Sequence, residues 1–208
     1  LATVSLDNTG RLWDAATGEQ VKSLWGHGDG VFTVDFSPDG SLLVSGSDDG
    51  NIRSWDAATG ASLRTLAGHG AEVISVSFGA GGSMLASGSY DRTVRLWDPV
   101  KGTLLATLEG HTQKVGGAGL SPDGTLVASG GYEGTVRIWD VLTGSSRVAA
   151  ELDGRVYCLG FHPDGKRVGA PCSNGSGYII NVQDGSMVEL EGHRSEVNYV
   201  RFSPDGRL

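Results

Sequence analysis

A histidine, a serine, a carboxylate and a tryptophan recur together at the same spacing in three successive stretches of the chain. A histidine, a hydroxyl and a carboxylate are also the groups of a hydrolase triad, in which the histidine activates the hydroxyl as a nucleophile. A nucleophilic site has no reason to be repeated every 42 residues, and no Gly-x-Ser-x-Gly turn surrounds these serines. The repetition therefore favours a structural quartet, in which indole, hydroxyl, imidazole and carboxylate satisfy one another by hydrogen bonding. The three sets are His27, Ser45, Asp49 and Trp55; His69, Ser87, Asp91 and Trp97; and His111, Ser129, Glu133 and Trp139.

The quartets lie in a tandem array whose elements are short strands. A Trp-Asp pair begins at Trp13, Trp55, Trp97 and Trp139, and a period of ~40–45 residues ending in this pair is typical of four-stranded units. Pro-Asp-Gly turns, such as residues 38–40, separate a run of alternating residues from a continuously apolar run. Because a continuous apolar run suits a strand covered on both faces, we expect each unit to be a small sheet packed between its neighbours.

With these features the chain resembles the WD-repeat β-propeller family, and the resemblance extends over essentially all 208 residues. It implies an all-β fold, a β-propeller of four-stranded antiparallel blades with about five repeats, four near-complete and one split between the termini. It also implies that residues 1–208 are a single propeller domain or a segment of a larger propeller. In this family the quartet ties the loop between blades to the inner strands of a blade.

The two ends of the chain carry the halves of one further repeat. Thr3, Asp7 and Trp13 form a quartet without its histidine, and His193 begins a unit that has no tryptophan before Leu208. In one interpretation the first and last segments share a blade and close a ring. In the other, which we favour, the chain is an excerpt from a longer array, since propellers of this family usually have more copies.

Departures from the repeat indicate weaker places. Glu133 stands where the other quartets have aspartate, and its longer side chain predicts a looser third quartet. Gly116 and Gly117 replace bulky residues and predict a weaker strand. The fourth copy has lost the quartet, residues 181–182 stand where Trp-Asp is expected, and an extra residue is expected within 173–178.

Composition limits the classes of partner. The formal net charge of −8 disfavours nucleic acid and anionic membrane surfaces as main partners. The sequence has no apolar run of membrane-spanning length and no signal-like start, so a cytoplasmic location is the default expectation. Neither metal-ligand spacing nor a phosphate-binding Gly-Lys-Ser/Thr loop occurs, so no metal or cofactor is predicted.

The resemblance places two positions of each repeat on the face around the central channel: the residue before the quartet carboxylate and a pair near the start of the first strand. Aromatic anchors with cationic neighbours are typical of interface hot spots, so we predict that this face binds protein. The alternative is that these aromatic residues only pack locally. The candidates are Phe32, Asp48, Ile74, Tyr90, Lys114, Tyr132, Arg155, Tyr157 and Asn198, together with Trp25, which lies outside the repeat register.

These features predict a non-enzymatic scaffold or sensor module that binds a peptide or protein segment around the channel. The similarity among copies resembles arrays in bacterial or fungal signalling proteins. Open blade edges predict association with one another or with further blades of the same parent protein. The first alternative is a propeller hydrolase or lyase, which would need a catalytic group that breaks the repeat inside the channel. The second is an engineered or excerpted fragment without a function of its own.

Overall fold

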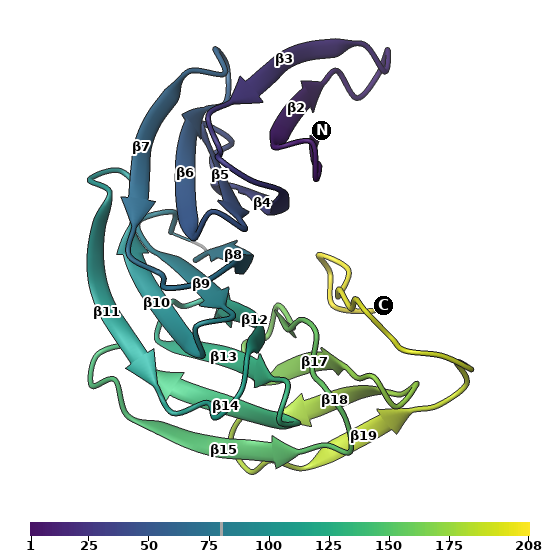
Figure 1. Cartoon of the computed structure of the whole chain (residues 1–208). Coiled ribbons are helices and arrows are strands. Elements are labelled where there is room, and N and C mark those ends of the chain that lie inside the picture. Colours follow the sequence, from purple (N-terminus) through teal and green to yellow (C-terminus); the bar gives the residue numbers. More distant parts are fainter. Residues whose placement is uncertain (80) are drawn as a thin grey trace.

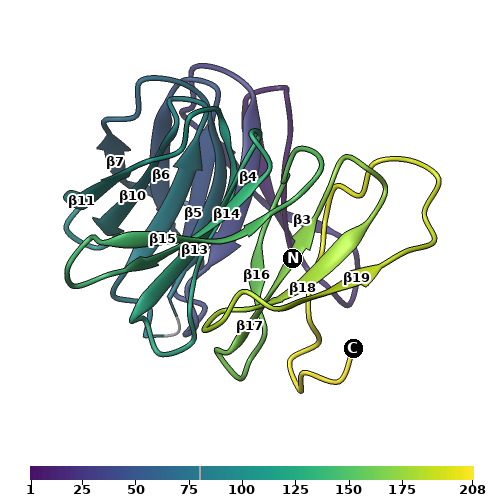
Figure 2. The same ribbon diagram turned by 90° about the horizontal axis from the view of Figure 1, so that it is seen from below.

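A computed structural model of the chain describes residues 1–79 and 81–208, and within these ranges it contains nineteen β-strands and no helix. The strands form small sheets that follow one another in an arc around a central axis (Figure 1), and Figure 2 shows the same arc from below. Accordingly, the described residues include no helix long and apolar enough to cross a membrane. The strands are β1 (Ala2–Val4), β2 (Thr9–Trp13), β3 (Gln20–Trp25), β4 (Val31–Phe36), β5 (Leu42–Ser47), β6 (Asn51–Asp56), β7 (Ser62–Ala67), β8 (Val73–Phe78), β9 (Leu85–Ser89), β10 (Thr93–Asp98), β11 (Thr103–Glu109), β12 (Val115–Leu120), β13 (Leu126–Gly131), β14 (Thr135–Asp140), β15 (Ser146–Glu151), β16 (Gly160–Phe161), β17 (Arg167–Pro171), β18 (Gly177–Asn181) and β19 (Met187–Leu190).

Each sheet is an antiparallel meander of consecutive strands. Four sheets have four strands, β4–β7, β8–β11, β12–β15 and β16–β19, and the first sheet has three, β1–β3. The predicted all-β fold of four-stranded antiparallel blades is therefore confirmed. The sheets do not close into a ring, and the two ends of the chain lie on either side of the opening in Figure 1.

The place of a strand in its blade follows from its residues. Every residue of β9 is buried, in keeping with its apolar and small side chains, whereas nearly all of β7 and all of β19 are exposed. The second strand of a blade is covered by neighbouring blades on both faces, and the fourth strand faces solvent. The sequence pattern of apolar inner runs and polar outer runs thus sets the radial order of the strands.

The Pro-Asp-Gly turns hold the first two strands of a blade together. In the turn after β4, the Gly40 N–H donates to the Ser37 carbonyl at 2.8 Å, and Gly40 has a φ of 71°, which glycine adopts without strain. The Ser37 hydroxyl donates to Asp39 at 2.6 Å and accepts the Leu42 N–H at 2.9 Å. Both side chains therefore supply hydrogen bonds that fix this tight turn.

The hydrophobic core is divided into layers that lie between adjacent blades. In one layer, Leu96 and Leu108 of the second blade pack with Val115, Val127 and Trp139 of the third. These side chains are nearly fully buried, and burying a Leu or Val contributes about 1.5–3 kcal/mol relative to exposure. Because each layer needs both blades, the blades stabilise one another in sequence along the array.

Hydrogen bonds also run between the innermost strands of neighbouring blades. The Val76 N–H donates to the Thr33 hydroxyl at 3.3 Å, and the Ala118 N–H donates to the Ser75 hydroxyl at 3.0 Å, each across 43 residues. The innermost strand presents a free backbone edge to the channel, so these side chains satisfy N–H groups that no strand pairs. The first and second blades thereby each accept hydrogen bonds from the blade that follows.

Gly116 and Gly117 lie in a complete six-residue strand, β12, whose residues are all buried. The prediction that they weaken the strand considered local strand propensity only and did not include their contact with the fourth blade. A Cβ at Gly117 would stand 2.5 Å from the Cys158 Cα, and one at Gly116 would overlap the Val156 carbonyl. The two glycines thus let the backbone around residue 158 lie directly against β12.

The fourth blade keeps the strand order but has a short first strand, the two-residue β16. Its register corrects the position of the missing Trp-Asp pair. Val168 pairs with Ile180 as Val127 pairs with Trp139 in the third blade, so Ile180 and Asn181 occupy the Trp-Asp positions and residues 173–178 contain no extra residue. The expected position, residues 181–182, is one residue too late. This repeat is one residue shorter than the others, and the shortening lies in the connection before Val156.

Residues 197–202 lie against the fourth blade as an innermost strand would. The Val197 N–H donates to the Cys172 carbonyl at 3.1 Å, just as the Val31 N–H donates to the Ser5 carbonyl at 3.0 Å between the first two sheets. The turn at residues 203–206 also repeats the hydrogen bond of the other turns, from the Gly206 N–H to the Ser203 carbonyl at 2.9 Å. This segment therefore has the form of the one strand that the sheet β1–β3 lacks.

Replacing Gly117 by alanine should lower the free energy of unfolding by about 2 kcal/mol, because the backbone of residue 158 cannot turn aside from the added methyl group. Gly119→Ala in the same strand is the matched control: its Cβ would meet the Leu159 carbonyl oxygen at 3.6 Å, an ordinary contact, and should change stability by no more than about 0.5 kcal/mol. Urea unfolding followed by tryptophan fluorescence measures both changes. Equal stability of the two variants would contradict the close packing on β12.

Candidate functional site

The structure brings the four side chains of each complete quartet together around a serine hydroxyl. In the second blade, the Trp97 Nε1–H donates to the Ser87 hydroxyl at 2.8 Å, Ser87 lies 2.7 Å from His69 Nε2, and His69 Nδ1 lies 2.8 Å from Asp91. Since indole can only donate, the serine O–H donates to Nε2, and the Nδ1–H of the imidazole donates to the carboxylate. The same geometry holds in the first quartet, with distances of 2.9, 2.8 and 3.0 Å.

The quartet connects three parts of a blade with the loop that leads into it. Ser87 lies in β9 and Trp97 in the adjacent β10, Asp91 lies in the turn between them, and His69 lies in the connection from β7 to β8. Asp91 also accepts the Gly70 N–H at 3.0 Å, so the loop is held by its backbone as well as by its histidine. The buried polar atoms are satisfied, and the path of the loop is fixed.

Burial decides the charge state of the quartets. It lowers the pKa of His69 below the ordinary 6.5, against the opposing effect of its hydrogen bond with Asp91, so the imidazole is neutral at neutral pH. Burial would raise the pKa of Asp91, but the hydrogen bonds from His69, Thr93 and Gly70 outweigh it and hold the pKa well below its usual range. The pKa of His27 and that of His111 are lowered for the same reason.

The serines of the quartets are out of reach of any substrate. Ser45, Ser87 and Ser129 expose 2%, 0% and 0% of their surface, and each hydroxyl is engaged by an indole and an imidazole. A nucleophilic hydroxyl needs an open path to its electrophile. The arrangement serves to bond the blade internally and leaves no room for hydrolase chemistry at these serines.

Glu133 does not loosen the third quartet. Ser129 lies 2.7 Å from both the Trp139 Nε1 and the His111 Nε2, distances as short as those in the second blade. The longer side chain still contacts His111, and its second oxygen accepts the Gln113 N–H at 3.1 Å, one residue further along the loop than in the other blades. The extra methylene is thus absorbed by a shift of the backbone contact.

The partial quartets at the two ends behave differently from each other. The Trp13 Nε1–H donates to the Thr3 hydroxyl at 2.8 Å, while Asp7 accepts the Thr9 N–H at 3.0 Å. His193 is exposed, and no hydrogen bond joins its side chain to another residue in the described ranges. The first sheet therefore has half of a quartet, and the C-terminal segment has none.

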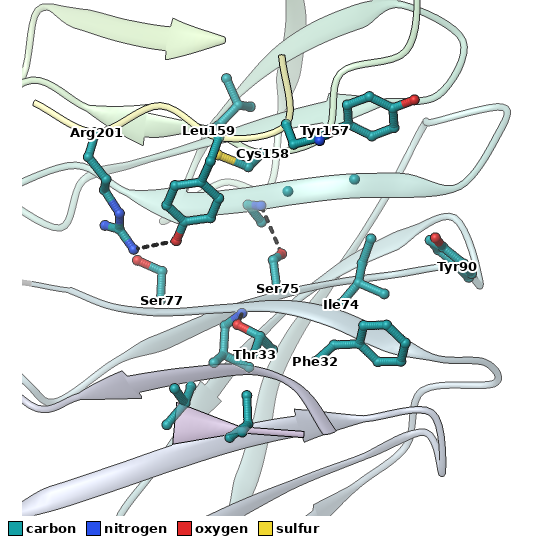
Figure 3. Close-up of a pocket in the computed structure, with 18 residues that line it drawn as sticks. Phe32, Thr33, Ile74, Ser75, Ser77, Tyr90, Tyr157, Cys158, Leu159 and Arg201 are labelled. Atoms are coloured by element: carbon teal, nitrogen blue, oxygen red, sulfur yellow. Dashed lines mark hydrogen bonds between the residues drawn. The ribbon is translucent and has the colours of Figure 1, made fainter. Parts of the chain in front are cut away.

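A cavity of about 390 Å³ lies where the innermost strands meet around the axis. β4 and β8 each contain a β-bulge after their first residue, which takes Phe32 and Ile74 out of the ladder. Bulges re-aim side chains, and Figure 3 shows both at the same end of the cavity as Tyr90 and Tyr157, with Arg201 and Ser77 at the other end. This end of the cavity is therefore apolar and aromatic.

Three tyrosines from successive repeats form a continuous row beside the cavity, which we call the aromatic row: Tyr90, Tyr132 and Tyr157. Tyr90 and Tyr132 share a hydrogen bond of 2.9 Å between their hydroxyls, and Tyr132 and Tyr157 meet edge to face at 5.7 Å between centroids. The Lys114 Nζ lies 3.8 Å from the Tyr90 ring centre, and the Arg155 guanidinium lies 5.6 Å from that of Tyr132. Burial and the bond to Tyr90 raise the pKa of Tyr132, which keeps its phenol protonated.

Nine of the ten predicted face residues belong to this region or border it. Phe32, Ile74, Tyr90, Tyr157 and Asn198 line the cavity, and Lys114, Tyr132 and Arg155 belong to the adjoining row of rings and cations. Asp48 lies in the turn after β5, where its N–H donates to the carbonyl of Gly30, two residues before Phe32, at 2.9 Å. Trp25 is different: it ends the outer strand β3, is 69% exposed and does not line the cavity.

Tyr199 and Arg201 are among the residues of the cavity that sequence reasoning did not single out. The Arg201 guanidinium donates to the Tyr199 hydroxyl at 3.0 Å. Tyr199 occupies the strand position that holds Thr33 and Ser75 in earlier repeats, where the side chain is small. A bulky residue at a position that is otherwise small was the signal that could have found it.

The chain matches the family described as "WD domain, G-beta repeat" over residues 18–56, 60–98, 102–140 and 185–208, more than half of its length. The chain therefore belongs to the WD-repeat family. The matched segments include the three complete quartets and leave out most of the fourth blade, which is the blade without one.

Curated relatives match over short segments. The chain is similar to WD repeat-containing protein SL1-17 of Schistosoma mansoni, with 39% identity over 67 residues that make up 32% of this chain and 22% of that protein. It is 53% identical to nuclear distribution protein PAC1 of Coccidioides posadasii over 49 residues, 24% of this chain and 10% of that protein. It is 51% identical to eukaryotic translation initiation factor 3 subunit I of Aspergillus oryzae over 45 residues, 22% of this chain and 13% of that protein. The chain thus spans 22% or less of the length of these relatives.

Replacing Ser87 by alanine should lower the free energy of unfolding by about 3 kcal/mol, because the Trp97 N–H and the His69 Nε2 would both lose their buried partner. Ser54→Ala is the matched control: Ser54 is also buried, but its hydroxyl has no hydrogen-bond partner among the described residues, so its loss should cost no more than about 0.5 kcal/mol. Chemical denaturation compares the two. A Ser87 variant no less stable than the Ser54 variant would show that the quartet does not hold the blade together.

Proposed function

We propose that the chain is a non-enzymatic scaffold or sensor module that docks a peptide or protein segment on the face around its central cavity. The observation that carries this proposal is the gathering of aromatic and cationic side chains at one end of the cavity. Phe32 is 47% exposed there, next to Ile74 and the aromatic row. Aromatic side chains at a concave surface with cations beside them are the composition of protein-interaction hot spots.

The names of the relatives support an interaction role. One relative is by name a subunit of a translation initiation factor, and another is a nuclear distribution protein. We do not assign the partners of these relatives to this chain, since it covers only a small part of each. What carries over is the class of function, a protein that works by binding other proteins.

A propeller hydrolase or lyase is less well supported. Such an enzyme would need a reactive group in the channel that departs from the repeat, and Cys158 and Arg201 are two of the departures that line the cavity. Burial raises the pKa of the Cys158 thiol, so it is protonated and a poor nucleophile at neutral pH. Arg201 carries a positive charge at all relevant pH values and cannot act as a base.

We also propose a cytoplasmic setting and a signalling role. Cys158 and Cys172 are both free thiols, which suits a reducing compartment. The signalling role rests on the resemblance of the repeats to arrays in signalling proteins, which is an analogy of fold.

Docking can be tested by selecting peptides from a random phage-displayed library on the immobilised chain. Selected peptides should lose at least tenfold in affinity on Phe32→Ala and Tyr90→Ala variants, because alanine removes the aromatic surface at the cavity end. Trp25→Ala is the control, since Trp25 is an aromatic residue even more exposed than Phe32 but lies away from the cavity. Loss of binding on Trp25→Ala alone would move the docking face to the outer strands, and failure to select any peptide would oppose the proposal.

We further infer that the open edges at the two ends of the array associate with each other between chains. In the parent protein, further blades would pair with these edges instead. The sheet β1–β3 lacks an innermost strand, while residues 197–202 lie on the fourth blade without a second strand to pair with. By the register of β4 on β5, Val200 would pair opposite Thr3, as Val34 pairs opposite Ser45. The two edges are thus complementary halves of one blade.

The 208-residue chain should therefore self-associate as its concentration rises, which sedimentation velocity measures. A synthetic peptide of residues 194–208 in excess should suppress association, because it offers the missing strand to β1. The same peptide with Val200→Pro is the control, since proline cannot donate to the ladder and is not tolerated in a paired strand. A chain that stays monomeric at all concentrations would contradict the inference.

A further inference from the structure

In each of the first three blades, two positions on the cavity face are tied to each other by a backbone hydrogen bond; we call these positions the rim. The Asp48 N–H donates to the Gly30 carbonyl at 2.9 Å, the Tyr90 N–H to the Glu72 carbonyl at 3.0 Å, and the Tyr132 N–H to the Lys114 carbonyl at 2.8 Å. Each pair joins the start of an innermost strand to the turn that carries the quartet carboxylate. The side chains at these positions therefore project from rigid backbone, which suits recognition of a fixed partner geometry.

Along the four blades β4–β19, charges at the rim are separated by sign, and Glu196 of the C-terminal segment accepts the Tyr157 hydroxyl at 2.9 Å beyond them. The first two blades contribute carboxylates: Asp29 directly precedes Gly30, whose carbonyl accepts the Asp48 N–H at 2.9 Å, and the Glu72 carbonyl accepts the Tyr90 N–H at 3.0 Å at the matching place of the next blade. In keeping with this arrangement, burial and then the negative charges of Asp29, Glu72 and Asp49 raise the pKa of Asp48. The next two repeats contribute Lys114 and Arg155. We call Asp29, Asp48 and Glu72 the acidic side and Lys114 and Arg155 the basic side.

The two sides do not neutralise each other within the chain. None of Asp29, Asp48, Glu72, Lys114 and Arg155 forms an ion pair among the described residues. The two cations instead lie over the tyrosine rings of the preceding repeat, at 3.8 and 5.6 Å from the ring centres. Opposite charges on one rim that form no ion pair with each other are available to a partner from outside.

We propose that the partner is an extended peptide segment in which an apolar or aromatic residue lies between a basic and an acidic residue. This rests on the proposed function of the face. The central side chain contacts Phe32 and Ile74 at the cavity end, the basic residue pairs with Asp48 and Glu72, and the acidic residue pairs with Lys114 and Arg155. Charge complementarity across both sides fixes the direction of the peptide on the face, which a uniformly charged surface would not do.

The test is a phage-displayed random-peptide selection on the full chain and on two charge-reversed variants, Asp48→Lys and Lys114→Glu. Peptides selected on the unmodified chain should carry an acidic and a basic residue on opposite sides of an apolar one. Each should lose about fivefold in affinity on either reversal, the size expected for one exposed charge pair replaced by repulsion. Reversing the matching charge of the peptide should restore affinity on the cognate variant only.

Matched controls carry the same change of net charge elsewhere on the surface. Glu19→Lys, in the turn between β2 and β3, controls for Asp48→Lys, and Lys166→Glu, after β16, controls for Lys114→Glu; both positions are exposed. Peptides that need Phe32 and Tyr90 but respond equally to reversal and control would overturn the charge-directed recognition and leave the docking face in place. Selection of no peptide, or of peptides indifferent to Phe32 and Tyr90, would overturn both.

Discussion

A serine hydroxyl that joins an indole to a neutral imidazole is the interaction on which the rest of the blade depends. Ser87 accepts from Trp97 and donates to His69, and His69 in turn donates to Asp91. All four polar groups lie in or beside a layer of apolar side chains, where an unpaired donor or acceptor costs about 1–3 kcal/mol. Each group donates to the next in a single series from indole to carboxylate. Removal of any one side chain therefore leaves the hydrogen-bonding group of a neighbour without its partner.

The same quartet positions the face that we propose binds a partner. The histidine stands three residues before a rim position, as His69 does before Glu72, and the carboxylate directly follows the other, as Asp91 follows Tyr90. Holding histidine and carboxylate together therefore holds both rim positions. Quartet residues and rim residues therefore lie next to each other in two segments of each repeat, the connection before the first strand and the turn after the second strand. Apart from Glu133, the quartet residues are the same in the three complete quartets, whereas the rim residues differ.

The sequence was enough to predict the blades and to bring the quartet residues together, because both depend on spacing that recurs in every copy. Three features depended on contacts between blades and could not be predicted in this way. Local propensity made Gly116 and Gly117 a weakness, whereas contact with the backbone of residue 158 gives them a packing role. The position of Lys114 over Tyr90 depends on the angle between two blades, and Tyr199 enters the cavity from a segment outside the named strands.

The hydrogen bonds between innermost strands give the array a polarity with a consequence for its biosynthesis. Thr33 and Ser75 accept N–H groups from the blade that follows, so a completed blade already displays the acceptors that the next one needs. Chains emerge from the ribosome with the N-terminus first, and units that form early can guide those that come later. The first and second blades can thus each serve as a template on which the next blade assembles while translation continues.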